Sequence, residues 1–166
     1  VGKEPSPAML DDVVNRYRAI GGYSPLPALT EEMARLMAPF VDPESEVGTA
    51  FLYSDPTIET AIDECRRSGV REIDFFMLSP FYNSRSTGAY MAAAKEYLSH
   101  LLLYRPKIVF IHSWCSEPLF IQWWARQIRR ACESWPDAFF LFSAHSLPRS
   151  PQEALYRSQI EGTAGL

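Results

Sequence analysis

Ala-Phe-Phe-Leu-Phe-Ser-Ala-His-Ser-Leu-Pro-Arg-Ser, residues 138–150, is the stretch from which we predict the fold. Its apolar run, Phe139 to Phe142, is typical of a short strand buried on both faces. Small polar residues end the run, and Pro148 cannot continue a strand ladder. We therefore expect His145 just past the carboxyl end of a central strand, where open α/β sheets bind ligands. The alternative is a loop histidine without a chemical role.

The remaining apolar patterns predict helices alternating with strands. Such strands need crossover connections, which are right-handed and produce a parallel sheet. We expect an α/β fold, a three-layer sandwich with a four-stranded parallel sheet, as one domain over residues 1–166. The expected strands are 47–53, 72–78, 107–111 and 139–142, and the expected helices are 7–18, 30–39, 56–68, 89–103, 118–133 and 153–161.

Composition excludes several classes of protein. The net charge of −4 and the lack of basic blocks interleaved with aromatics argue against nucleic-acid binding. No run of about 18 apolar residues predicts a membrane span, and the start resembles neither a signal nor a transit peptide. Cys65, Cys115 and Cys132 lack CxxC spacing, which fits reduced thiols in the cytoplasm. Because neither end carries a terminal strand or cap, we expect both ends to be cut, with a first strand lost upstream.

Loops that follow the predicted strands carry the candidate chemistry, and in a parallel sheet these loops share one edge. One hypothesis is a metal site there, with His145 and His112, Cys115 or Glu117 as ligands. Cys115 with either histidine is an alternative nucleophile–base pair, although a packing role fits it better. No Gly-rich phosphate loop and no GxSxG elbow occurs.

Several motifs together resemble one family. Residues 142–148 are similar to the SAHSLP signature of ferrochelatases, lyases that insert ferrous iron into a porphyrin in haem biosynthesis. Residues 16–26 resemble that family's RYxxIGGxSPL stretch, and residues 79–90 resemble its proline–aromatic, Ser/Thr-rich loop with a following Tyr. Further similarity to the coproporphyrin-using branch of Gram-positive bacteria comes from Ser113-Trp114, Glu117-Pro118 and Trp124.

The resemblance implies roles for five residues. His145 matches the histidine that binds the incoming metal or takes pyrrole protons, and imidazole suits both tasks near neutral pH. Arg16, Tyr17, Ser24 and Tyr90 match contacts to the porphyrin and its carboxylates, for which an arginine fork is well suited. Fe²⁺ is then a substrate, a porphyrin (coproporphyrin III or protoporphyrin IX) is the partner ligand, and no organic cofactor is implied.

The resemblance covers only the first of two similar α/β halves, between which the family holds its porphyrin. The second half, with the carboxylate opposite the histidine, is absent, and the GDPYxxQ segment is reduced to residues 155–159. We expect an incomplete, weakly active or inactive chelatase that needs the missing half-domain. The alternatives are a non-catalytic tetrapyrrole- or metal-binding module or subunit, and a domain that keeps SAHSLP for folding.

Overall fold

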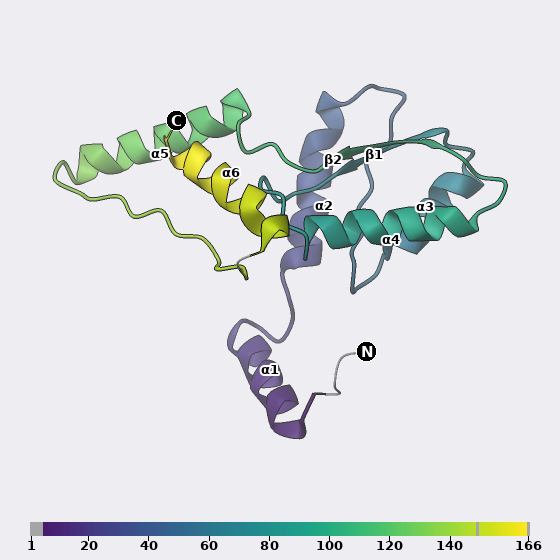
Figure 1. Cartoon of the computed structure of the whole chain (residues 1–166), viewed down its shortest axis with the longest axis horizontal. Coiled ribbons are helices and arrows are strands. Elements are labelled where there is room, and N and C mark those ends of the chain that lie inside the picture. The colour runs from purple at the N-terminus through teal and green to yellow at the C-terminus, as the bar shows by residue number, and fades with distance from the viewer. Residues whose placement is uncertain (1–4, 149, 166) are drawn as a thin grey trace. The chain divides into compact units, whose positions relative to one another are not determined.

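A computed structural model describes residues 5–148 and 150–165, and the chain divides into two compact units, residues 1–49 and 50–166 (Figure 1). The described residues form an α/β structure with a parallel sheet. Its helices and strands, with two short 3₁₀ turns, are α1 (Pro7–Ala19), α2 (Leu26–Met37), η1 (Ala38–Phe40), α3 (Ile58–Arg67), β1 (Glu72–Phe76), α4 (Thr87–His100), β2 (Lys107–Ile111), α5 (Pro118–Ser134), η2 (Pro151–Glu153) and α6 (Ala154–Gly165).

The first unit consists of two helices with a glycine turn between them. Ser6 caps α1 by accepting a hydrogen bond from the Met9 N–H at 3.3 Å, and Gly21 and Gly22 follow the helix with φ of +103° and +91°. The predicted start of the second helix at residue 30 is wrong, because α2 already begins at Leu26. Proline is tolerated in a first helical turn, where its missing N–H has no intrahelical partner.

The second unit is built on a two-stranded parallel sheet, which confirms two predicted strands and their direction. β1 pairs with β2 in register from Glu72 opposite Lys107 to Phe76 opposite Ile111. Side chains alternate between the two faces of a strand, so one face of the sheet turns its residues toward α3 and α4. The buried core on that face is Ile58, Ile62, Ala94 and Leu98, against which Phe75, Ile108 and Phe110 pack.

The predicted four-stranded sheet is wrong for the described residues, which form only β1 and β2. In the segment 47–53, Phe51 makes a single bridge to Thr57 and its N–H bonds to the Pro56 carbonyl, so the chain turns back locally. Residues 139–142 adopt no strand, and the side chains of Phe139 and Leu141 are almost completely exposed. A strand exists only when its backbone pairs with a neighbour, and an apolar run does not specify that neighbour.

The other helices lie close to their predicted positions. α3 begins at Ile58 rather than at Pro56, because the Thr57 hydroxyl accepts from the Thr60 N–H at 3.2 Å and caps it. α4 begins and ends slightly earlier than predicted, from Thr87 to His100. Within residues 5–148 and 150–165, no helix has the length and apolar character needed to cross a membrane.

Candidate functional site

His145 lines a groove of about 560 Å³. Its volume is within the range of about 300–1,000 Å³ typical of small-molecule sites. One wall is the loop from Ala144 to Pro148, in which His145 is exposed, and the other wall is formed by η2 and α6. The α6 side chains on this wall are Tyr156, Arg157, Ile160 and Glu161. The groove therefore offers an imidazole, a guanidinium and the carboxylates of Glu153 and Glu161 beside apolar and aromatic surface.

Gln159 attaches α6 to the carboxyl edge of the sheet. Its Oε1 accepts a hydrogen bond from the Tyr82 N–H at 2.8 Å, in the loop that follows β1. Its Nε2 donates to the Ser113 hydroxyl at 2.8 Å, in the loop that follows β2. The Ser113 hydroxyl in turn lies 3.1 Å from the Pro80 carbonyl, to which it donates. One amide thus links both loops to the helix that forms the far wall of the groove.

Two further side chains strengthen this attachment. The buried Glu153 carboxylate accepts from both the hydroxyl and the N–H of Ser84, in the same loop after β1. The Thr163 hydroxyl lies 3.1 Å from the Cys115 carbonyl, in the loop after β2, and 2.8 Å from the Gln159 carbonyl of its own helix, and it can donate its one proton to either. The backbone positions of η2 and α6 are therefore fixed by polar bonds to both loops.

The predicted multi-ligand metal site does not form around His145. The His112 ring packs edge-on against Tyr82, with 5.6 Å between ring centres, and Cys115 is buried. Glu117 lies at the N-terminus of α5. Among the residues that the structure describes, no three His, Cys, Asp or Glu side chains are grouped closely enough to hold a metal ion. Of these candidates, only His145 lines the groove.

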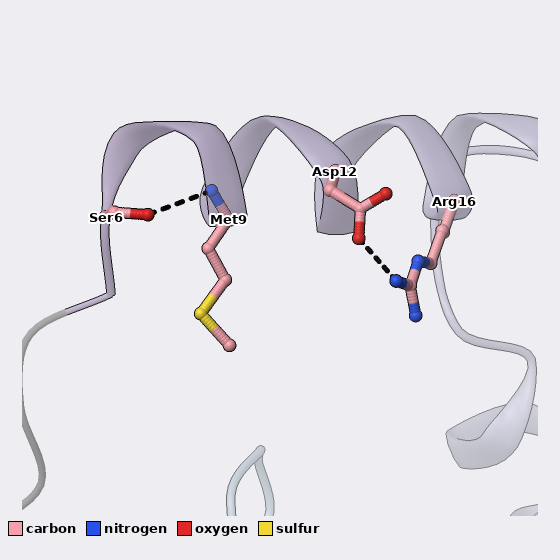
Figure 2. A network of polar contacts seen from close by, with 4 residues as sticks. All are labelled: Ser6, Met9, Asp12 and Arg16. Carbon is pink, nitrogen blue, oxygen red and sulfur yellow. Dashed lines mark hydrogen bonds and ion pairs between the residues drawn. The ribbon is translucent and has the colours of Figure 1, made fainter.

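The predicted porphyrin contacts in the first unit lie on and after α1. Arg16 forms an ion pair with Asp12 one helical turn earlier, and both side chains are exposed (Figure 2). Tyr17 is also exposed on α1, whereas the Ser24 hydroxyl accepts from the Leu26 N–H at 3.2 Å. A carboxylate that binds Arg16 must therefore compete with Asp12.

Tyr90, the remaining predicted contact, lies in the first turn of α4. It is half-buried and packs against the core cluster of the second unit. It does not line the groove of His145 among the residues described. The structure therefore does not bring these two predicted site residues into one pocket.

Sequence reasoning missed the side chains that hold the groove in place. The sequence predicts Gln159 only as the last residue of the GDPYxxQ-like segment, and Glu153 only as the first residue of a helix. The available signal was a glutamine and a glutamate just after the SAHSLP stretch. Their partners are distant in sequence, so no local spacing identifies them.

Comparisons with known proteins agree with the motifs. A family model described as "Ferrochelatase" matches residues 2–166. The coproporphyrin III ferrochelatase of Halalkalibacterium halodurans is 34% identical over 175 aligned positions, which cover 99% of this chain and 56% of that protein.

Two further relatives carry the same description. The Geobacillus kaustophilus protein is 35% identical, with 98% of this chain and 55% of the relative covered. The Listeria monocytogenes protein is also 35% identical, with 98% and 56% covered. The chain thus spans just over half the length of these relatives. A match along almost its whole length shows that the chain belongs to the ferrochelatase family.

Proposed function

We propose that this chain takes part in the insertion of ferrous iron into a porphyrin, coproporphyrin III or protoporphyrin IX, with His145 facing the metal. The observation that carries the proposal is the exposed His145 on a groove of small-molecule size, within the SAHSLP motif. The descriptions of its relatives as coproporphyrin III ferrochelatases support coproporphyrin III as the first substrate to test.

The reaction consumes Fe²⁺ and a porphyrin with two pyrrole N–H groups, and it releases the iron porphyrin and two protons. A neutral imidazole has one lone pair, which can either bind the incoming Fe²⁺ or accept a pyrrole proton. His145 supplies that lone pair in the proposal. Arg16 is proposed to bind a porphyrin carboxylate, and Tyr17, Ser24 and Tyr90 are proposed to contact the macrocycle or its carboxylates.

Complete turnover is proposed to need more than these residues. The chain covers just over half of each relative's length, and the resemblance implies that a second half-domain supplies the opposite wall and a carboxylate. We therefore expect residues 1–166 alone to insert iron slowly or not at all. The cytoplasm is the proposed location, supported by an odd number of cysteines that lack CxxC spacing.

The test is an anaerobic incubation of the chain with Fe²⁺ and coproporphyrin III, followed by absorption spectroscopy. The full-length relative from Halalkalibacterium halodurans is the positive control, and the His145→Ala variant is the negative control. Slow insertion that disappears in His145→Ala supports the proposal. Insertion at the rate of the full-length relative would refute the requirement for a second half, and insertion unaffected by His145→Ala would refute the role of the histidine.

The second candidate is a non-catalytic tetrapyrrole-binding module or subunit, supported by the imidazole of His145 and the guanidinium of Arg157 on one groove. Titration with coproporphyrin III and with haem separates the two functions. Binding without iron insertion, even after addition of the missing half of a relative, favours the module. Restored insertion in that mixture favours the enzyme.

A further inference from the structure

We propose that Gln159 is a positioning residue that sets the geometry of the His145 groove by fixing α6 to two loops at the sheet edge. This inference rests on the proposed function, in which the groove receives a tetrapyrrole. Gln159 itself does not line the groove, so it acts through the residues that do.

One face of α6 bonds to the loops at the sheet edge, and another face lines the groove. Gln159 and Thr163 are one turn apart and bond to the loops after β1 and β2. Tyr156 and Ile160, also one turn apart, line the groove. Because residues four apart share a helix face, rotation of α6 that breaks the first pair also displaces the second.

The chemistry of the position fits an amide. The Tyr82 N–H needs an acceptor, and Nε2 supplies a donor to the Ser113 hydroxyl, both at 2.8 Å. Leucine has a similar size but neither group, so it would leave the half-buried N–H without its partner. A carboxylate would keep the acceptor for Tyr82 and could accept from the Ser113 hydroxyl, which can rotate away from the Pro80 carbonyl.

The effect on binding is expected to be moderate. Each lost hydrogen bond corresponds to about 1 kcal/mol, or about fivefold in an equilibrium constant. Since the wall side chains would have to be reordered by the ligand, we expect the Kd for coproporphyrin III to rise about fivefold or more in Gln159→Leu. Ser158→Ala is the matched control, because Ser158 lies on the exposed side of the same helix.

The experiment titrates coproporphyrin III into the wild-type chain, Gln159→Leu, Gln159→Glu and Ser158→Ala, each checked for an intact thermal unfolding transition. In parallel, the rate at which diethyl pyrocarbonate modifies His145 is measured by peptide mass spectrometry, with His100 on α4 as the internal standard. We expect weaker binding and faster His145 modification in Gln159→Leu, near wild-type values in Gln159→Glu, and no change in Ser158→Ala. The recovery in Gln159→Glu separates positioning by the two bonds from a general need for the glutamine.

A folded Gln159→Leu variant with wild-type Kd and wild-type His145 reactivity would overturn the inference, as would equal effects in Ser158→Ala. If Gln159→Leu does not fold, Ser113→Ala takes its place: weaker binding of coproporphyrin III and faster modification of His145 are expected, and unchanged values overturn the inference. If the wild-type chain does not bind coproporphyrin III, the proposed function fails. The His145 modification rates then decide the positioning role by themselves.

Discussion

Replacement of Asp12 by asparagine is predicted to strengthen porphyrin binding slightly while it weakens α1. Arg16 is a proposed carboxylate contact, yet in the structure its guanidinium is paired with the Asp12 carboxylate (Figure 2). Any porphyrin carboxylate must first displace this partner. Asp12→Asn removes the competing charge and leaves Arg16 in place.

The magnitude follows from the exposure of the pair. Arg16 and Asp12 have exposed side-chain fractions of 76% and 55%, and exposed pairs at this helical spacing contribute about 0.3–0.5 kcal/mol. That energy corresponds to a factor of about two in Kd. We therefore expect Asp12→Asn to lower the Kd for coproporphyrin III about twofold at low ionic strength, with the difference shrinking in high salt.

The assay is a fluorescence titration of coproporphyrin III at low and high salt. Asp11→Asn is the matched control, because it removes the same charge from the same helix, whereas Asp11 forms no ion pair among the residues that the structure describes. Arg16→Ala should weaken binding in both salts. Equal affinities for Asp12→Asn and Asp11→Asn, or an unchanged Kd in Arg16→Ala, would refute the idea that Asp12 holds a carboxylate-binding arginine.

Three further outcomes are expected. Ile62→Ala, at a side chain only 1% exposed, should lower the free energy of unfolding by about 2–5 kcal/mol in urea titrations, and a loss below about 1 kcal/mol would show that this core is not closely packed. Burial raises the pKa of Tyr104, so the folded state holds the phenol proton more tightly than the unfolded chain does, and the resulting stability is lost as pH rises above about 10. Tyr104→Phe should therefore flatten the fall of Tm between pH 9 and 11, although it also removes the hydrogen bond to the Val70 carbonyl. Arg157→Ala should raise the Kd for coproporphyrin III by up to about fivefold, since it removes a cation from the His145 groove, whereas an uncharged apolar ligand should show no such change.

Local signals in the sequence predicted the elements whose determinants are local. The predicted range 7–18 agrees closely with α1, whose two ends are defined by the hydroxyl of Ser6 and by the glycines that follow the helix. β1 and β2 were also predicted, together with their parallel direction, because a helix-length segment separates them. The ends of α1 are thus determined by interactions within a few residues, and the parallel direction of β1 and β2 by the length of their connection.

Pairing between distant segments could not be predicted in the same way. The apolar run 139–142 has the composition of a buried strand, but in the structure it pairs with no strand and exposes Phe139 and Leu141. The segment 47–53 likewise reaches only a single bridge, to Thr57. Composition predicts that a segment can be buried, whereas a ladder also needs an adjacent, unpaired backbone edge.

The candidate site likewise has some determinants that are local in sequence and others that are distant. The groove is made by residues 144–161, so the proximity of His145 to Arg157 follows from a short stretch of chain around one turn. Its attachment to the sheet depends on bonds from Gln159 to Tyr82 and Ser113, which are 77 and 46 residues away in sequence. A motif such as SAHSLP can therefore identify the reactive side chain without indicating what holds it in place. It follows that substitutions within the motif should change the chemistry of the groove, whereas substitutions at its distant anchors should change affinity while the imidazole itself stays intact.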